Sequence, residues 1–359
     1  MRRRVRLRIA QVLTASTGGI GRHVAELTGR LLDRGDLVEV WCPPETADQH
    51  LGELVERGLR VHHRVDGSLL GADVVHAHGY KATAGVLPIA RLRRIPLVST
   101  WHNLPPGPGR GRQALDHRVG AVSQRLAARA DLVLGASADL VEIARALGAT
   151  ARLGPVAAPR LDRPRVDRAD VRRSLGSAPG AFVVLTVGRL APQKNLGMLV
   201  DVATQLSGRL GLEFWVAGAG PEHERLTRTV AERGLAVRLL GHRTDVAELI
   251  GAADVALLTS HWEARALFAQ EAMAAGLPLV TTRVGGMAEL VDDAAVLVAP
   301  DDGPAAARAI EQLAAHPDRR SRLAELGRSR AREWPTADDA TAVVLDAYAE
   351  MLGRNGSVW

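Results

Sequence analysis

Short apolar runs alternate with amphipathic helical patterns along the first half of the chain. Apolar runs at 8–15, 37–42, 72–77 and 96–100 predict strands. Between the first two runs, residues 21–34 place apolar side chains at helical spacing and predict a helix. Strands separated by helices form right-handed βαβ units, so this half is predicted to hold a parallel sheet covered by helices.

The alternation lapses between 153 and 180, which is rich in Pro, Arg and Asp, and then resumes. Strands are predicted at 182–187, 213–217, 237–240, 255–259 and 279–282, and a helix at about 195–206. The predicted fold class is therefore α/β, with two Rossmann-like doubly wound domains. The predicted boundaries are an N-terminal domain at 1–160, a linker at 161–180, a C-terminal domain at 181–333, and a last helix at 334–359 that packs back on the body.

Length and composition support two soluble domains. The chain has 359 residues, more than one hydrophobic core usually supports, and it is 47% hydrophobic and 24% charged. The apolar run near the start is broken by Arg6, Arg8 and Gln11, which favours a first strand over a secretory signal. The single cysteine, Cys42, excludes an internal disulfide. We therefore expect a cytoplasmic protein.

Arginine supplies almost all of the positive charge. The net charge is +6, and Lys81 and Lys194 are the only lysines among 46 basic residues. In a chain that otherwise uses arginine, a lysine indicates a site that needs a compact point charge. Aromatic residues make up only 3% of the chain and do not interleave with arginine runs, which argues against nucleic acid as a partner.

Arg189 and Lys194 lie in one short loop after the predicted strand at 182–187, and a helix begins at the end of that loop. A guanidinium offers paired donors, an ammonium a mobile charge, and a helix start a partial positive charge. Together these groups suit a diphosphate. The alternative is two solvated loop cations.

Glu263 and Glu271 lie eight positions apart beside an apolar segment. If both were helical they would be about 80° apart around the helix axis, so they would not share a face. We therefore place Glu263 in a loop and Glu271 early in the following helix, where a carboxylate can accept hydrogen bonds from two adjacent sugar hydroxyls. The alternative for Glu271 is a helix former on a solvated face.

The chain resembles the family-4, or group 1, retaining glycosyltransferases of the GT-B fold over nearly its whole length. The order and spacing of the matching stretches make the resemblance specific. These stretches are Thr17-Gly-Gly-Ile-Gly-Arg-His-Val, Asp73-Val-Val-His-Ala-His-Gly, Val98-Ser-Thr-Trp-His, Val187-Gly-Arg-Leu with Lys194, Ala217-Gly-Ala-Gly-Pro-Glu, Gly251-Ala-Ala-Asp-Val, Glu263 to Glu271, and Gly276-Leu-Pro-Leu-Val to Glu289.

The resemblance implies a role for each matching residue. It assigns His102 and Glu263 to catalysis next to the transferred sugar. It assigns three residues to the donor diphosphate, namely Gly19, Arg189 and Lys194. It assigns the donor ribose and sugar to Glu263, Ala266, Leu267 and Glu271.

The resemblance also implies transfer with retention and no bound metal or other cofactor. The expected co-substrate is a nucleotide-diphosphate sugar, with UDP or GDP as the expected nucleotide. We find no carboxylate that would serve as a nucleophile for double displacement. A same-face mechanism, in which the departing diphosphate helps to deprotonate the acceptor, is therefore preferred. The acceptor, a small molecule or a lipid-linked one, is expected on the N-terminal domain.

One stretch departs from the family pattern. The family usually has Gly-Phe-Gly after its first glutamate, whereas Ala264, Arg265 and Ala266 follow Glu263 here. Two added methyl groups narrow the approach to the backbone amides. Three interpretations follow for Arg265: the donor sugar is acidic, the side chain points away from the sugar, or the enzyme is weakened. Two other functions therefore stay open, a nucleotide-sugar epimerase and a catalytically silent sugar-nucleotide binding protein.

Three further patterns have alternative interpretations. The glycines at 18, 19 and 21 do not complete a dinucleotide fingerprint, because Val24 occupies the third glycine position. His76 and His78 would share one side of a strand, but with no Cys or carboxylate partner a structural or cleft-lining role is favoured over metal binding. A helix at 113–130 is predicted to be an ordinary domain helix with a solvated face, or alternatively a peripheral attachment to an anionic membrane.

Overall fold

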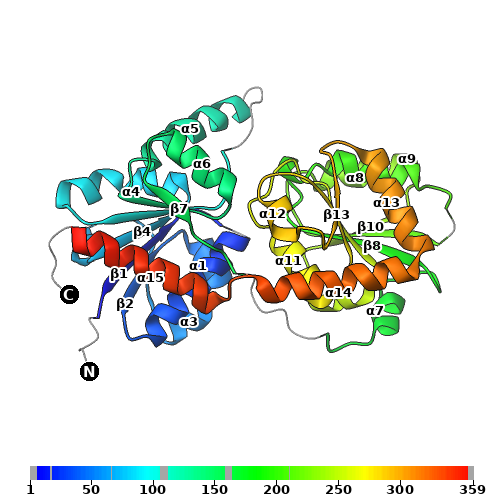
Figure 1. The fold of residues 1–359 in the computed structure, drawn as a ribbon, viewed down its shortest axis with the longest axis horizontal. Coiled ribbons are helices and arrows are strands. Elements are labelled where there is room, and N and C mark those ends of the chain that lie inside the picture. The colour runs from blue at the N-terminus through cyan, green and yellow to red at the C-terminus, as the bar shows by residue number, and fades with distance from the viewer. Residues whose placement is uncertain are drawn as a thin grey trace. The chain divides into compact units, whose positions relative to one another are not determined.

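The computed structural model describes residues 6–16, 18–65, 67–105, 112–157, 164–209 and 211–354. The chain divides into two compact units. Unit 1 consists of Met1–Pro159 together with Pro335–Trp359, and unit 2 consists of Arg160–Trp334. Figure 1 labels the elements of both units, and each unit is described by itself.

Unit 1 contains a parallel sheet with the strand order β3-β2-β1-β4-β5-β6-β7. Every residue of β4 and β5 is buried, as expected for a parallel sheet covered on both faces. The strands are β1 (Arg8–Leu13), β2 (Leu37–Trp41), β3 (Arg60–His62), β4 (Val74–His78), β5 (Leu97–Trp101), β6 (Leu132–Gly135) and β7 (Ala151–Leu153).

The helices of unit 1 include the last helix of the chain, α15, which packs against α1 and against β5. Its Val344, Ala347 and Tyr348 enter the same core cluster as Ile9 and Val98, so the end of the chain completes the core of unit 1 (Figure 1). The helical elements are α1 (Gly19–Asp33), α2 (Pro44–His50), α3 (Gly52–Glu56), η1 (Gly67–Gly71), α4 (Tyr80–Arg93), α5 (Arg112–Ala127), α6 (Ala138–Ala146) and α15 (Ala337–Arg354).

Unit 2 contains a second parallel sheet with the strand order β10-β9-β8-β11-β12-β13. Successive residues of β8 point to opposite faces, so Val184 joins one core cluster while Val183 and Leu185 join the other. The strands are β8 (Phe182–Val187), β9 (Leu212–Ala217), β10 (Val237–Gly241), β11 (Val255–Leu258), β12 (Leu279–Thr282) and β13 (Val296–Val298).

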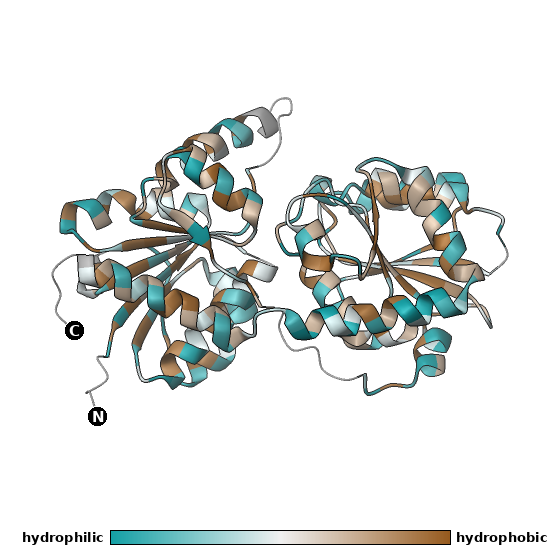
Figure 2. Ribbon diagram, in the orientation of Figure 1, coloured by the Kyte–Doolittle hydropathy of each residue, from teal (hydrophilic) through white to brown (hydrophobic). Residues whose placement is uncertain are grey.

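Helices cover both faces of the second sheet, and their apolar positions turn toward the strands (Figure 2). The longest of them is α14, which packs along α11. The helical elements are α7 (Arg168–Ser174), η2 (Pro192–Lys194), α8 (Leu196–Gln205), α9 (His223–Arg233), α10 (Val246–Ala252), α11 (Leu267–Ala275), α12 (Met287–Val291), α13 (Gly303–Ala315) and α14 (Pro317–Glu333).

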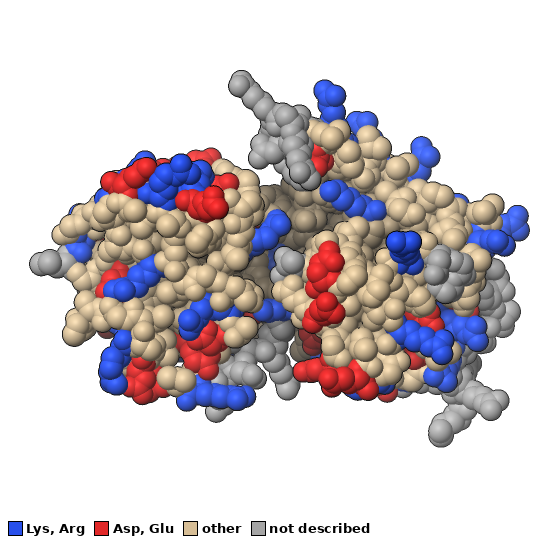
Figure 3. Space-filling model, turned by 180° about the vertical axis from the view of Figure 1, so that it is seen from behind, with Lys and Arg blue, Asp and Glu red and all other residues tan. Residues whose placement is uncertain are grey.

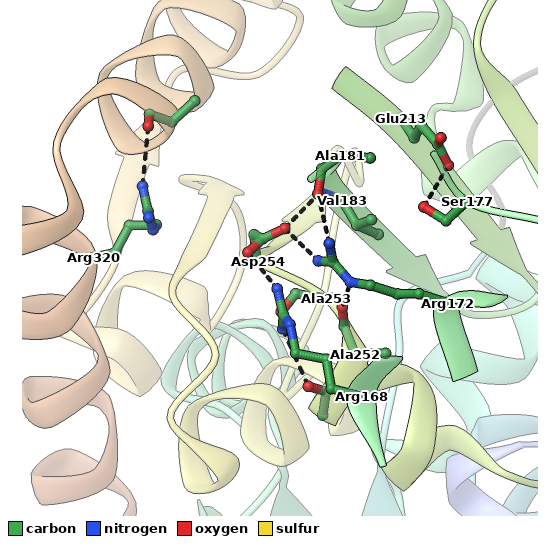
Figure 4. Close-up of polar contacts among 12 residues, drawn as sticks. Arg168, Arg172, Ser177, Ala181, Val183, Glu213, Ala252, Ala253, Asp254 and Arg320 are labelled. Atoms are coloured by element: carbon green, nitrogen blue, oxygen red, sulfur yellow. Dashed lines mark hydrogen bonds and ion pairs between the residues drawn. The ribbon is translucent and has the colours of Figure 1, made fainter. Parts of the chain in front are cut away.

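The interval 161–180, predicted to be a linker, differs from that expectation because it contains α7. Two arginines anchor this helix to unit 2 (Figure 4). Arg168 and Arg172 each bond one carboxylate oxygen of Asp254, at 2.5 and 2.6 Å, and the same carboxylate accepts the backbone N–H of Val183 at 2.7 Å. Arg172 also donates to the carbonyl oxygens of Ala181 and Ala252. The composition of 153–180 does not predict this helix, because α7 buries only Val171 and is otherwise anchored by polar contacts to distant residues.

Both sheets reverse their strand order at one point. In unit 1 the chain adds β2 and β3 on one side of β1 and then returns to add β4 on the other side. In unit 2 it adds β9 and β10 on one side of β8 and then β11 on the other. In doubly wound sheets, ligands bind beyond the carboxyl ends of the strands at such a switch point. The loops after β1, β4, β8 and β11 are therefore where a site is expected.

Charges of both signs lie side by side on the surface that Figure 3 presents. Such mixed charge is usual for a soluble surface and does not form a single basic stripe on this face. Among the described residues, no helix is both long enough and apolar enough to cross a bilayer.

The anchoring of α7 generates a stability prediction. Arg172→Met should lower the free energy of unfolding by about 2 kcal/mol, because it removes hydrogen bonds to a carboxylate and to two buried carbonyls. Arg173→Met is the matched control, since the neighbouring Arg173 makes an exposed ion pair with Asp170 and should change stability by less than about 0.5 kcal/mol. Denaturant unfolding of both variants measures the difference, and equal stabilities would contradict this account of α7.

Candidate functional site

The loop after β8 carries the two predicted diphosphate-binding cations of unit 2. Lys194 ends the short helix η2, and Asn195 follows in the left-handed region with φ 48°. The Asn195 side chain accepts the backbone N–H of Met198 at 3.3 Å and so caps the start of α8. Lys194 is thereby held directly before a helix N-terminus.

A second loop packs its backbone against this one. Leu190 N–H donates to Ala219 O at 2.8 Å, and Glu222 N–H donates to Leu190 O at 2.9 Å. A Cβ at Gly218 would lie 1.8 Å from Gly188 O, and Gly218 has φ 150°. Only glycine permits this approach, so the glycines of the second loop fix the path of the first.

Lys194 reaches across to the loop after β11. Its Nζ donates to Glu263 Oε1 at 2.5 Å, and the Ser260 hydroxyl donates to the same oxygen at 2.7 Å. The Glu263 side chain is only about a tenth exposed. Lys194 and Glu263, 69 positions apart in the sequence, thus form one charge-paired centre at the switch point.

The backbone of the β11 loop is fixed on two sides. Thr259 Oγ1 donates to Lys194 O at 2.9 Å, and His261 N–H donates to Gln193 O at 2.8 Å. On the other side, Gly286 N–H donates to Glu263 O at 2.9 Å. These bonds hold the Glu263 carboxylate in place without a ligand.

Glu271 lies in the helix that follows. α11 begins at Leu267 with Ala266 as its N-cap residue, and Glu271 lies in the second turn. Glu271 and Ala266 are buried, and Leu267 is half-buried. The expected placement of Glu263 in a loop and Glu271 in the helix agrees with the structure. The burial of Glu271 disagrees with the alternative of a solvated helix former.

Arg189 lies on the same loop as Lys194 but is exposed. Within the described part of the chain, its side chain makes no hydrogen bond or ion pair. Its guanidinium is therefore available to a ligand of unit 2, whereas the Lys194 ammonium is already paired with Glu263.

Arg265 lies among charges on α12 and α14. The charges that act on it are Glu289 and Arg330, and burial lowers the pKa of its guanidinium. Its Nε and Nη2 are buried and have no partner among the described residues. Of the three interpretations from the sequence, this environment favours a side chain that points away from the sugar.

In unit 1, His102 follows β5 and contacts a histidine at the end of β4. His102 Nε2 lies 3.3 Å from His78 Nδ1, and His78 Nε2 lies 2.6 Å from Gln11 Oε1. Gln11, on β1, also donates to the Tyr348 hydroxyl at 3.2 Å. A residue of the last helix thus reaches His102 through two buried side chains.

Three histidines form the one group within the described residues that has the spacing for a metal ion. Ring nitrogens of His23, His78 and His102 all lie within 4.8 Å of one another. His76, which the sequence paired with His78, instead bonds Tyr348 and Thr100, each at 2.7 Å. The nitrogens of His78 and His102 that face each other form a hydrogen bond, so these two atoms are already paired within the protein.

Burial keeps these imidazoles neutral. It lowers the pKa of His23 to about 4 and that of His76 to about 3, and the neighbouring His23 lowers the latter further. Burial and the surrounding histidines also hold the pKa of His78 and of His102 well below the usual value. At neutral pH each ring therefore has one N–H donor and one lone pair.

Gly19 is the first residue of α1, and His23 follows one turn later. The His23 ring lies 5.2 Å from the His102 ring, measured between centroids, so the start of α1 and His102 lie at the same edge of the unit 1 sheet. His102 therefore lies near the first turn of α1, which begins at Gly19.

Several residues of these sites escaped the sequence prediction. Ser260 lies three positions before Glu263, and no sequence pattern assigns it a role. His23 lies in the matching stretch that begins at Thr17, but that stretch predicts no separate role for it. Gln11 and Tyr348 carry no motif, and Tyr348 comes from a helix that was expected only to pack on the body.

Comparison with protein-family models gives two matches. Residues 17–154 match the model described as Glycosyltransferase Family 4, and residues 167–330 match the model described as Glycosyl transferases group 1. The second match begins just before α7, which agrees with the place of that helix in unit 2.

Curated relatives match over nearly the whole chain. A glycogen synthase of Mycobacterium tuberculosis is 31% identical, and the match covers 91% of this chain and 90% of the relative. A D-inositol 3-phosphate glycosyltransferase of Xylanimonas cellulosilytica is 30% identical, and the match covers 95% of this chain and 94% of the relative.

Solved structures share the fold. The Anabaena protein HepE in complex with UDP-glucose aligns with a TM-score of 0.81 at 20% identity, covering 96% of this chain and all of that one. A sucrose-phosphate synthase of Thermosynechococcus elongatus aligns with a TM-score of 0.78 at 21% identity, covering 97% of this chain and all of that one. The predicted fold class, α/β of GT-B type with two Rossmann-like parts, is confirmed.

The neutral histidines generate a prediction about acid stability. Below pH 6.5 the unfolded chain takes up protons that buried His76 does not, so the free energy of unfolding falls as the pH falls toward about 3. Between pH 7 and 5 His76 alone contributes a loss of about 2 kcal/mol. Denaturant unfolding at both pH values measures the loss.

His76→Gln should retain less of this pH dependence than the wild type. His316→Gln, which replaces an exposed histidine of unit 2, serves as the control and should keep it. An unchanged difference between pH 7 and 5 in His76→Gln would show that His76 titrates normally.

Proposed function

The chain belongs to the group 1 glycosyltransferases, and from this membership we propose that it transfers a sugar from a nucleotide-diphosphate donor with retention of configuration. Unit 2 binds the donor and unit 1 binds the acceptor. The observation that carries the proposal is the Lys194–Glu263 pair, which is fixed by Ser260 and by the backbone of two loops at the switch point of the unit 2 sheet.

Arg189 and Lys194 hold the donor diphosphate. The exposed guanidinium of Arg189 offers paired donors to phosphate oxygens, and Lys194 adds a point charge beside the start of α8. Since Lys194 contacts Glu263 directly, the diphosphate and the sugar that Glu263 binds lie next to each other. The bond to be broken joins these two groups.

Glu271, Ala266 and Leu267 bind the ribose and the sugar. The start of α11 presents backbone N–H groups at Ala266 and Leu267, and hydroxyl oxygens can accept from them. The buried Glu271 carboxylate accepts hydrogen bonds from the two ribose hydroxyls. Because the Arg265 guanidinium is mostly buried and is influenced by Glu289 and Arg330, an acidic donor sugar is not required.

The transfer follows a same-face mechanism without a metal ion. Arg189, Lys194 and the helix starts stabilise the negative charge that develops on the departing diphosphate, which in turn takes the proton of the acceptor hydroxyl. We assign His102 to the transferred sugar and Gly19 to the donor phosphates, which are the roles that the family resemblance implies. The absence of a metal is part of the proposal, in which Arg189, Lys194 and the helix starts supply the positive charge beside the diphosphate.

UDP is the preferred nucleotide and GDP the alternative. The solved HepE complexes contain UDP and UDP-glucose, which supports a uridine nucleotide for a chain of the same fold. The names of the curated relatives refer to different compounds, glycogen and D-inositol 3-phosphate, so we propose the acceptor only as a small or lipid-linked hydroxyl compound.

Substitutions in the donor site test the proposal. Lys194→Ala and Glu271→Ala should each lower transfer by at least about 100-fold, because each removes a buried or paired contact to the donor, while the fold stays intact. Lys81→Ala is the matched control: Lys81 is the only other lysine and is exposed on α4, so activity should not change. The donor is first identified by thermal shift with nucleotide diphosphates and their sugars.

Other outcomes of these assays contradict the proposal. Full activity in Lys194→Ala would remove its main support. A product formed from the donor alone, with no acceptor present, would indicate the epimerase. Donor binding without transfer or hydrolysis for any acceptor would indicate a silent binding protein.

We further propose that unit 1 attaches peripherally to an anionic membrane at the cytoplasmic face. Four apolar residues of α5 are exposed: Leu115 (61%), Val119 (47%), Val122 (56%) and Leu126 (37%). They span an arc of only about 60° around the helix axis, and α5 packs on α4 through its other face. This arrangement supports membrane contact over a solvated domain helix.

The charge beside this apolar stripe favours anionic lipid. Arg118 and Arg125 lie along one flank and are exposed, and Arg129 follows just after the helix. An exposed apolar stripe with arginines beside it is typical of helices that lie in the membrane interface. A lipid-linked acceptor would then reach unit 1 without leaving the bilayer surface.

Liposome sedimentation tests the membrane contact. Changing Leu115 and Val122 together to Gln should weaken binding to anionic vesicles by about tenfold, because two half-exposed apolar side chains no longer enter the lipid. Leu92→Gln is the control, since Leu92 is 78% exposed on α4, outside the stripe. The proposal would be contradicted if the wild type did not bind anionic vesicles, or if the Leu115 and Val122 double variant bound them as well as Leu92→Gln does.

A further inference from the structure

Six side chains of unit 1 form a continuous, buried string of hydrogen bonds that ends at His102. We call it the Tyr348 network. From its far end the links are Thr100 Oγ1 to His76 Nε2 (2.7 Å), His76 Nδ1 to Tyr348 Oη (2.7 Å), Tyr348 Oη to Gln11 Nε2 (3.2 Å), Gln11 Oε1 to His78 Nε2 (2.6 Å) and His78 Nδ1 to His102 Nε2 (3.3 Å).

The Gln11 amide sets the direction of every donor in the network. Its oxygen can only accept, so the facing Nε2 of His78 carries a hydrogen, and Nδ1 of His78 is left as a lone pair. That lone pair accepts from His102 Nε2–H. On the other side, the amide nitrogen donates to Tyr348, whose hydroxyl donates to His76 Nδ1.

The links cannot reverse one at a time. Each neutral imidazole has one donor and one acceptor, so a reversed amide would have to reverse all three histidine tautomers together. An intermediate arrangement would leave two donors or two lone pairs facing each other inside the protein. Gln11, His76 and Tyr348 are fully buried, and water cannot repair such a mismatch.

The position of His102 gives the network a consequence for function. His102 itself is only half-buried, and it is the one member of the network outside the core of unit 1. With Nε2–H committed to His78, its remaining ring nitrogen, Nδ1, is a lone pair. A ring in this state can accept a hydrogen bond from a substrate hydroxyl and cannot donate one.

We propose that Tyr348 and Gln11 are positioning residues that fix His102 as the Nε2–H tautomer, so that its Nδ1 accepts a hydrogen bond from a sugar or acceptor hydroxyl. The assignment of that hydroxyl rests on the proposed function, whereas the tautomer does not. The last helix of the chain thereby contributes to the active site of unit 1 without touching the substrate. Its role is to hold the direction of the hydrogen bonds.

Nitrogen NMR of the full chain with labelled histidine tests the tautomer directly. In the wild type, His102 should carry its hydrogen on Nε2 and His78 should carry its hydrogen on Nε2 as well, with the signals assigned from His102→Gln and His78→Gln. Tyr348→Phe removes the hydroxyl that joins Gln11 to His76 and keeps the aromatic ring. In this variant His78 and His102 should show mixed tautomers.

Activity gives the second readout. Tyr348→Phe should lower kcat by about tenfold, through a misdirected hydrogen bond at His102, while KM for the donor stays within about twofold because unit 2 is untouched. Tyr80→Phe is the matched control: Tyr80 is the only other tyrosine, is buried in unit 1 and bonds Leu104 O at 3.5 Å outside the network. It should change neither the tautomers nor kcat.

Two results would overturn the inference. One is a wild-type His102 with its hydrogen on Nδ1, and the other is a Tyr348→Phe variant with wild-type tautomers and kcat. If Tyr348→Phe does not fold, Gln11→Met breaks the same network at its centre with a side chain of similar size. Absence of any transfer activity would remove the proposed function and leave the tautomer measurement to decide on the network.

Discussion

The reversal of strand order in each sheet is the constraint on which both candidate sites depend. At β1 and β4, and again at β8 and β11, the loops that follow two neighbouring strands run in opposite directions. A ligand can therefore bind beyond the ends of these strands. Gly19 follows β1 and Arg189 follows β8, while His78 ends β4 and Glu263 follows β11. Each unit therefore brings its chemistry to the same topological position, although the two sequences supply different residues there.

Unit 2 uses backbone packing to hold a charge. The glycines after β9 allow their loop to press against the loop after β8, and that contact fixes the path that leads to Lys194. Lys194 then pairs with Glu263, whose own loop is tied to Gln193 and Gly286. A cation held in this way needs no reorganisation when negative charge develops beside it, which is the property that lets a fixed charge stabilise a transition state.

The sequence predicted the parts of this fold that depend on local pattern. Runs of apolar and β-branched residues such as 182–187 and 279–282 identified their strands with the correct bounds, and motif spacing placed Glu263 in a loop and Glu271 in a helix. The sequence did not predict features that depend on contacts between residues far apart in the chain. The helix α7 is held by Asp254, more than 80 positions away, and Tyr348 reaches Gln11 across 337 positions. The local sequence around such residues does not indicate which distant residue each one contacts.

The two units differ in electrostatics, and the difference bears on where the acceptor proton goes. Unit 2 presents paired and exposed cations, whereas unit 1 presents histidines whose pKa values are held well below the usual range by burial and by one another. A histidine in that state can orient a hydroxyl through its lone pair but is a poor base. In the proposed transfer, the departing diphosphate becomes the stronger base as the bond to the sugar breaks. The neutral histidines therefore favour a mechanism in which the leaving group, rather than a side chain, takes the proton.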